Sequence, residues 1–363
     1  MNSRELVRRT LEFASPPSVP RQAWILPWAE ERYPVEVARL RAVFPDDLVA
    51  APALYRTPLP VVGSRYDKGV YTDEWGCRFT NIHGGVIGMV REPLVRNWDD
   101  LSQFRTPDAS LAVDREAVNS FCRDTDRFVL AGTLVRPFER LTFIRTMEQA
   151  MVDLAEQPPE LDDLLGRIHA HYLKEVEAWA CTDVDAIVLM DDWGTQRRMM
   201  VAPELWRRKF KPLYREYNEI ARRYGKYVFM HSDGYITDII ADLIEVGVNA
   251  LNSQIKCMGA AELGLRFRGQ ITFWGEMDRQ ELLAFGSVAE VRRAVAEARA
   301  SLYANGGVIA QCEFGPGAKP ENVYEVFLAW RELDENQPQI PQSAVAATAE
   351  ARRRDPKPPR RET

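Results

Sequence analysis

The chain has 363 residues, 46% of them hydrophobic and 28% charged, and its 53 acidic and 47 basic side chains give a formal net charge of -6. This composition is typical of a folded protein with a large core, which excludes an intrinsically disordered chain. The negative balance argues against a nucleic-acid-binding protein that relies on phosphate neutralisation.

The start of the chain and its cysteines indicate the compartment. Residues 1–9 carry charges of both signs and lack the apolar run and cleavage site of a secretory signal. No apolar stretch approaches the roughly 18–20 residues of a membrane-spanning helix, so we expect a cytoplasmic protein. The five cysteines are widely scattered and odd in number, which argues against a disulfide framework.

Short β-rich apolar runs alternate along the chain with amphipathic stretches, a pattern that predicts parallel strands joined by crossover helices. Residues 203–223 and 288–304, for example, place apolar side chains three and four positions apart. Eight runs predict a (β/α)8 TIM-type barrel, because eight is the closure number of that fold. The predicted strands are Ala23–Leu26, Leu48–Ala51, Phe128–Ala131, Ala186–Met190, Tyr227–Met230, Val248–Leu251, Ile271–Trp274 and Val308–Ala310.

Two segments depart from this alternation. Residues 58–105 are rich in glycine and aromatic side chains and predict an inserted β-hairpin region or long loop over one end of the barrel. This insert is either a lid or substrate wall near the active-site mouth, or a structural excursion. Residues 337–363 are rich in Pro, Ala and Arg without apolar periodicity, so we expect a disordered tail after a barrel domain spanning residues 1–336.

Four predicted strands end in polar clusters, and the C-terminal ends of the strands carry the active site in this kind of barrel. The clusters contain His, Cys, Asp and Glu, which are the ligand types of zinc. His231 is the one histidine of four that follows a predicted strand, and Cys312 follows the last strand. The alternative interpretation of His231 is a hydrogen-bonded histidine that binds no metal. The alternative interpretation of Cys312 is a buried cysteine in an apolar environment. The clusters are Asp191-Asp192-Trp193-Gly194, His231-Ser232-Asp233-Gly234, Gly275-Glu276-Met277-Asp278 and Gln311-Cys312-Glu313.

Three segments resemble the C-terminal half of the uroporphyrinogen decarboxylase superfamily. They are YVFMHSDGYITDIIADLIEVGVNALN, ITFWGEMD and GGVIAQCEFGPGAKPENVYEVF. The resemblance implies a (β/α)8 barrel, in agreement with the strand pattern. One branch of the superfamily decarboxylates a tetrapyrrole without a cofactor, and another contains corrinoid-dependent methyltransferases that use a barrel-bound zinc.

Individual residues favour the methyltransferase branch. The decarboxylases carry an arginine-rich motif at the first strand end, where this chain has Pro27-Trp28-Ala29. The methyltransferases have a His-x-Cys motif and a second cysteine after the last strand. His231 and Cys312 match the outer positions, and Asp233 stands in place of the middle cysteine. The resemblance therefore implies a zinc site of His231, Cys312 and Asp233, with Glu276 as a substitute or fourth ligand.

We therefore expect a zinc-dependent methyltransferase that moves a methyl group from a small methoxylated or methylated donor to a corrinoid (cobalamin) carrier. The corrinoid would belong to a separate partner protein, because the sequence has no Asp-x-His-x-x-Gly module. Catalytic residues at the donor pocket would be Asp191, Asp192, Arg136 and Tyr235. Two alternatives stay open: a metal-independent decarboxylase of a tetrapyrrole or other carboxylic acid, and a non-catalytic barrel that binds a tetrapyrrole or corrinoid. Homodimer formation is also open.

Overall fold

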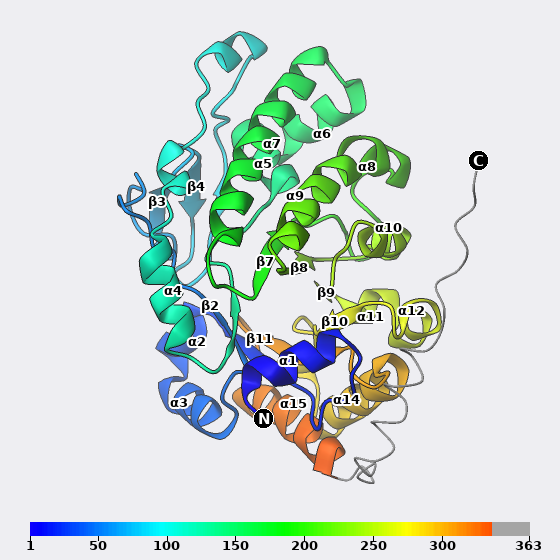
Figure 1. Ribbon diagram of the computed structural model, residues 1–363. Helices are drawn as coiled ribbons and strands as arrows, with labels where there is room; N and C mark the ends of the chain where they lie inside the picture. Colours follow the sequence, from blue (N-terminus) through cyan, green and yellow to red (C-terminus); the bar gives the residue numbers. More distant parts are fainter. Residues whose placement is uncertain (336–363) are drawn as a thin grey trace, which may run out of the picture.

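A computed structural model describes residues 1–335 of the chain (Figure 1). Eight parallel strands form one sheet in the order β1-β11-β10-β9-β8-β7-β6-β2, which confirms the predicted (β/α)8 barrel. The tail expected at residues 337–363 lies outside the described residues. The strands are β1 (Arg21–Ile25), β2 (Leu48–Ala50), β6 (Phe128–Leu130), β7 (Ala186–Met190), β8 (Tyr227–Ser232), β9 (Ala250–Ser253), β10 (Thr272–Trp274) and β11 (Val308–Phe314).

Between β1 and β2, side-chain carboxylates replace the regular backbone hydrogen bonds that join the other neighbouring strands of the barrel. The backbone N–H of Asp47 donates to the carbonyl of Arg21 at 2.9 Å, and Oδ2 of Asp47 accepts from the N–H of Arg21 at 2.9 Å. Oδ1 of Asp46 accepts from the N–H of Ala23 at 2.8 Å. The backbone groups at this edge are therefore satisfied although the two strands do not pair in register.

Helices surround the sheet, and α1 covers its N-terminal end (Figure 1). Among the described helices, none combines the length and hydropathy that crossing a membrane requires. The longer helices are α1 (Ser3–Leu11), α3 (Pro34–Val43), α4 (Arg115–Arg123), α5 (Pro137–Arg145), α6 (Met147–Glu156), α7 (Pro159–Ala180), α9 (Lys211–Arg223), α12 (Ala260–Phe267), α14 (Val288–Leu302) and α15 (Pro320–Glu335). Shorter ones are α2 (Pro27–Arg32), α8 (Pro203–Lys209), α10 (Ile240–Glu245), α11 (Ile255–Met258), α13 (Leu282–Phe285), and the 3-10 turns η1 (Trp98–Ser102), η2 (Asp108–Leu111) and η3 (Thr237–Ile239).

The buried apolar side chains form two layers, one inside the barrel and one between the barrel and its helices. Successive side chains of a strand point to opposite faces, so the position of a residue in its strand decides its layer. In β11, Ile309 packs inside the barrel, whereas Ala310, Cys312 and Phe314 belong to the outer layer. This alternation also determines which strand-end residues reach the barrel mouth.

The insert contains a three-stranded antiparallel sheet of β3 (Gly69–Thr72), β4 (Arg78–Asn81) and β5 (Met89–Val90), drawn beside α4 in Figure 1. Two buried arginines of α5 attach the segment around this sheet to the barrel. Arg140 Nη1 donates to Oδ2 of Asp73 at 2.5 Å, and Arg145 Nη1 donates to the carbonyl of Val95 at 2.7 Å. The insert is therefore fixed against the helix that follows β6.

Candidate functional site

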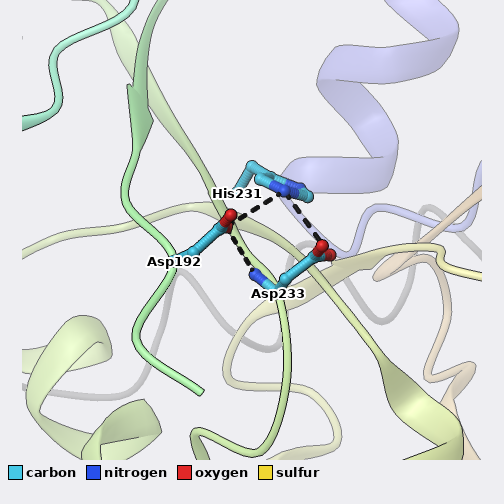
Figure 2. A group of neighbouring side chains, drawn as sticks. All are labelled: Asp192, His231 and Asp233. Atoms are coloured by element: carbon cyan, nitrogen blue, oxygen red, sulfur yellow. Dashed lines mark hydrogen bonds and ion pairs between the residues drawn. The ribbon is translucent and has the colours of Figure 1, made fainter. Parts of the chain in front are cut away.

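Neighbouring strands β7 and β8 bring Asp192, His231 and Asp233 together. Met190, at the end of β7, lies opposite His231 in the strand register, and Asp192 and Asp233 each follow two residues later. One ligand atom from each of the three residues lies within 4.8 Å of the others (Figure 2). His231 Nε2 is 3.4 Å from Asp192 Oδ1 and 3.6 Å from Asp233 Oδ1.

Close backbone contact between two loops positions the aspartates. The N–H of Asp233 donates to Asp192 Oδ1 at 2.9 Å, and the N–H of Gly194 donates to the carbonyl of Asp233 at 3.0 Å. A Cβ on Gly194 would lie 2.4 Å from the nitrogen of Tyr235, and a Cβ on Gly234 would lie 2.2 Å from the backbone of Gly194. The two loops can approach this closely only with glycine at both positions.

Asn252, at β9, fixes the orientation of the His231 ring. Nδ2 of Asn252 donates to the carbonyl of Trp274 and, at 3.0 Å, to Oε1 of Gln311. Oδ1 of Asn252 must therefore accept, and His231 Nδ1 lies 2.6 Å from it. Because Nδ1 carries the proton of this hydrogen bond, the neutral ring presents the lone pair of Nε2 to the two aspartates.

The donor set fits a divalent metal ion. Asp233 Oδ1 is buried without a hydrogen-bond partner among the described residues, and it faces His231 Nε2. One imidazole nitrogen and two carboxylate oxygens supply three ligands, the number that a catalytic zinc site takes from the protein, and each is of a type that zinc binds. Asp192, His231 and Asp233 are therefore the residues of the described chain that could hold zinc.

Arg279 connects this cluster to two further carboxylates. Nη2 of Arg279 contacts Oδ2 of Asp233, and Nη1 lies 2.9 Å from Glu276 Oε2 and 3.6 Å from Glu313 Oε2. Burial opposes the charge of Arg279, but the three carboxylates raise its pKa. Arg279 therefore stays positive and holds Asp233 by one oxygen, which leaves Oδ1 directed at His231.

Burial and neighbouring charges change the pKa values of the site. Burial alone would lower the pKa of His231, but the carboxylates of Asp192 and Asp233 raise it to about 9. Although burial disfavours the charge of Asp192, its hydrogen bond with His231 lowers the pKa of Asp192. Burial raises the pKa of Glu276 to about 8, against the effect of Arg279. At neutral pH the metal-free site therefore holds a proton on His231 and a second on Glu276.

The metal-free protein should lose stability as the pH rises through these values. The pKa of His231 is raised from 6.5, so its contribution to folding is complete below pH 6.5 and is lost as the pH rises through about 9. The pKa of Glu276 is raised from 4.5, so its contribution is lost as the pH rises from 4.5 through about 8. For His231 the free energy of unfolding should fall by at most about 3 kcal/mol. Urea unfolding across this window tests this, and His231→Gln should flatten the decrease.

Cys312 does not join this cluster, and the expected pairing of Cys312 with His231 is wrong. The register of β11 with β1 pairs Gln311 with Gln22 and Cys312 with Ala23. Gln311 reaches Asn252 inside the barrel, whereas Cys312 packs in the outer hydrophobic layer and is fully buried. Burial raises the pKa of the Cys312 thiol well above its ordinary value. Strand alternation therefore turns the thiol away from the barrel mouth.

Asp191 and Tyr235 make packing and hydrogen-bond contacts outside the three-residue cluster. Asp191 is completely buried and accepts from the N–H groups of Phe138 and Glu139, at the start of α5, and from the hydroxyl of Tyr214. Burial raises the pKa of Asp191 well above its ordinary value. The ring of Tyr235 packs against the outer hydrophobic layer. Asp191 is thus a helix cap, which corrects the expectation that it lines the donor pocket, whereas the expected role of Tyr235 stays a prediction.

Arg136 lies between the cluster and a cavity of about 220 Å³ beside the insert. Its Nη2 lies 3.3 Å from Sδ of Met190, the residue opposite His231, and Nη1 lies 3.4 Å from Oε2 of Glu139. The structure thus places Arg136 where it can contact a ligand. Glu276 lies beside Arg279 rather than within the three-residue cluster.

Sequence reasoning did not identify Arg279 and Asn252 as site residues. Asn252 could have been identified from the sequence, because it directly follows a predicted strand. Arg279 lies beyond the turn after β10, and its three carboxylate partners come from three different strand ends. Local sequence patterns do not predict such contacts between residues that are far apart in the chain.

Residues 66–333 match the family model of uroporphyrinogen decarboxylase (URO-D), which is more than half of the chain. The chain belongs to the URO-D family. Among solved structures, a methyltransferase from Methanosarcina mazei superposes on this URO-D family member with a TM-score of 0.66 and 15% sequence identity, over 92% of this chain and 99% of that one. At this identity the likeness concerns the fold.

An endo-beta-1,4-xylanase of glycoside hydrolase family 10 from Gloeophyllum trabeum is similar at a TM-score of 0.41 and 11% identity, over 88% of this chain and 99% of that one. No curated protein sequence matches the chain significantly.

Proposed function

We propose that this protein is a metal-dependent methyltransferase that transfers a methyl group from a small methoxylated or methylated donor to a corrinoid acceptor. The observation that carries the proposal is the cluster of Asp192, His231 and Asp233 at the strand ends, with His231 Nε2 directed at two carboxylates. Membership of the URO-D family and the fold shared with a methyltransferase support the same conclusion.

Zinc is the proposed metal, held by the nitrogen of His231 and the carboxylates of Asp192 and Asp233. When bound, zinc would act as a Lewis acid on the heteroatom that carries the methyl group. A site without thiolate donates little charge to the metal, which favours polarisation of a donor oxygen over activation of a thiol. This replaces the expected site that included Cys312.

Glu276 is the proposed proton source. In the reaction the bond between the methyl carbon and the donor oxygen breaks, and the methyl carbon bonds to the reduced cobalt of the corrinoid substrate, which supplies the electron pair. The donor oxygen keeps the electrons of the broken bond and takes the proton of Glu276. Burial raises the pKa of Glu276 to about 8 in the metal-free protein, and we expect this buried carboxyl group to stay protonated at neutral pH when the metal is bound. Arg279, 2.9 Å away, stabilises the carboxylate that remains.

Apolar side chains below the cluster exclude water from its inner face. The ring of Trp24 lies 5.3 Å from the ring of His231, and Trp24 contacts Trp274 edge to face at 5.2 Å. Gln22 Oε1 accepts from the indole N–H groups of both tryptophans, at 3.2 and 2.9 Å. The donor and the acceptor must therefore reach the metal site from the outer end of the barrel.

A methyl-transfer assay tests the proposal. Zinc-loaded protein is mixed with reduced cobalamin and a panel of methoxylated and methylaminated compounds, and methylcobalamin is followed by its absorption spectrum. We expect methylcobalamin and demethylated donor in equal amounts, and no reaction after zinc is removed by a chelator. Formation of methylcobalamin at the same rate by the zinc-free protein would contradict the proposal.

The ion pairing within the cluster favours a second candidate, a metal-independent decarboxylase. Protonated His231 can satisfy Asp192 and Asp233 by itself, because their carboxylates raise its pKa to about 9. The imidazolium could then protonate a carboxylic acid substrate as it loses carbon dioxide, and Arg136, which contacts Met190, could bind a carboxylate of that substrate. Release of carbon dioxide from a carboxylic acid by the chelator-treated protein would favour this candidate over methyl transfer.

A further inference from the structure

A narrow crevice leads from solvent to the carboxyl group of Glu276. It has a volume of about 20 Å³ and lies between the loop after β7, the start of α11 and the turn after β10. Glu276, at 3% exposure, is a buried part of its lining, whereas Gln196, Lys256 and Gln280 are exposed lining residues. The crevice shares no lining residue with the larger cavity beside the insert, so it is a separate feature of the barrel mouth.

The crevice has the size and the polarity that suit water. About 10–15 Å³ is enough for one water molecule where two to four polar partners are available. The lining supplies such partners, because the amides of Gln196 and Gln254 and the carboxyl group of Glu276 border the crevice. Its volume of about 20 Å³ leaves no room for a substrate.

Hydrogen bonds and an ion pair fix the walls of the crevice. Gln196 Nε2 donates to Gln254 Oε1 at 2.7 Å, which joins the loop after β7 to the start of α11. Lys256 Nζ donates to Asp278 Oδ2 at 3.0 Å, which joins α11 to the turn after β10. The thiol of Cys257 donates to the carbonyl of Gln254 at 3.1 Å. These contacts connect three strand ends, so the opening is built into the rim of the barrel.

The proposed reaction needs a route for protons, because it consumes a proton in each turnover. The donor oxygen takes the proton of Glu276, and the carboxylate that remains must regain a proton from solvent before the next turnover. Aromatic side chains close the inner face of the site, and the donor and the acceptor approach from the outer end of the barrel. The crevice reaches Glu276 from the side of the β9 and β10 ends, which leaves a route while both substrates are bound.

We propose that water in this crevice carries protons from bulk solvent to Glu276, and that Gln254 and Cys257 position this water. The inference rests on the proposed function, because it assigns the proton supply of the same site. In the overall reaction the donor ether, reduced cobalt and a solvent proton give the demethylated donor and methylated cobalt, with the electron pair supplied by cobalt. Glu276 therefore ends each cycle protonated, as it began.

Infrared spectroscopy of the metal-free protein tests the route without any turnover. The carbonyl band of the protonated Glu276 carboxyl group is identified by its absence from Glu276→Gln, and its shift after rapid mixing with heavy water reports exchange of the proton. Cys257→Leu should fill the crevice and slow this exchange about tenfold or more, because water then lacks the space it needs. Cys257→Ser keeps the size and polarity and should exchange at the wild-type rate. So should the matched control Cys181→Leu, which alters a half-buried cysteine that follows α7.

Methyl transfer by the zinc-loaded variants gives a second readout. The first turnover uses the proton already on Glu276, so Cys257→Leu should form about one equivalent of methylcobalamin at the wild-type rate. Its later turnovers should be slower by about tenfold or more, since Glu276 then waits for its proton. The wild-type protein and Cys257→Ser should show no such change of rate.

Gln254→Leu provides a second variant in case Cys257→Leu does not fold. It keeps the bulk of the side chain but removes a polar partner of the water, so it should also slow the exchange. Absence of a Glu276 carbonyl band from the wild-type protein, or exchange at the wild-type rate in the folded leucine variants, would overturn the proposal. Slowed exchange in a protein that transfers no methyl group would contradict the proposed function alone. Methyl transfer without a burst, together with unslowed exchange, would contradict this inference alone.

Discussion

Protein carrying His231→Gln is expected to contain almost no zinc after purification in the presence of zinc, whereas the wild-type protein should contain about one equivalent. The imidazole is the one nitrogen ligand of the cluster, and its Nε2 faces both carboxylates. Loss of a residue that supports a ligand typically weakens metal binding about 10–100-fold, so loss of the ligand itself should weaken it more. Metal content by inductively coupled plasma mass spectrometry and folding by circular dichroism are the measurements.

Three further variants complete this experiment. His169→Gln, in α7, removes a histidine that is hydrogen-bonded to Tyr217 and should keep full zinc. Cys312→Ala should also keep zinc while lowering the free energy of unfolding by about 1–2 kcal/mol, because the thiol packs in the outer layer. Asn252→Ala should lower zinc affinity about 10–100-fold, since the His231 ring loses its hydrogen-bond partner. Loss of zinc from Cys312→Ala as complete as that from His231→Gln would show that the site has been assigned to the wrong residues.

Glu276→Gln should lower the rate of methyl transfer about 10²–10⁴-fold without loss of zinc. Glutamine keeps the shape and the contact with Arg279 but cannot donate the proton that the leaving oxygen requires. The wild-type rate should fall as the pH rises above about 8, because Glu276 then loses its proton. The variant should lack this decrease. Rates measured across this pH range for both proteins test the assignment.

Glu313→Gln is the matched control, because Glu313 also pairs with Arg279, at the longer distance of 3.6 Å, and is less buried than Glu276. It should have a much smaller effect on the rate and keep the wild-type pH profile. A Glu276→Gln variant as active as Glu313→Gln would exclude Glu276 as the proton source.

The strands of this fold could be predicted because buried parallel strands are short, nearly continuous apolar runs. All eight predicted runs overlap strands of the sheet, including the three-residue β2. The way in which the barrel closes between β1 and β2 could not be predicted. It depends on the side chains of Asp46 and Asp47 at the seam, and a side-chain contact with a distant strand leaves no periodic signal.

The sequence predicted which residues come close because their strands are neighbours. It did not predict on which face of its strand a residue lies. Asp192 and Asp233 come close to His231 because β7 and β8 are adjacent and end at the same level. Cys312 is adjacent in sequence to Gln311 and Glu313, yet a shift of one residue along a strand reverses the face. The polar character of Gln311 and Glu313 on either side of the cysteine was the available signal for its outward direction.

X-ray absorption spectroscopy of the zinc-loaded wild-type protein tests whether Asp192, His231 and Asp233 are the metal ligands, because the ligand atoms are identified by their distances. With Asp192, His231 and Asp233 as ligands, the first shell should contain only nitrogen and oxygen, at about 2.0–2.2 Å, with the scattering pattern of a single imidazole. That shell should disappear in His231→Gln. A sulfur ligand at about 2.3 Å would contradict this account, because it would place a cysteine thiolate on the metal.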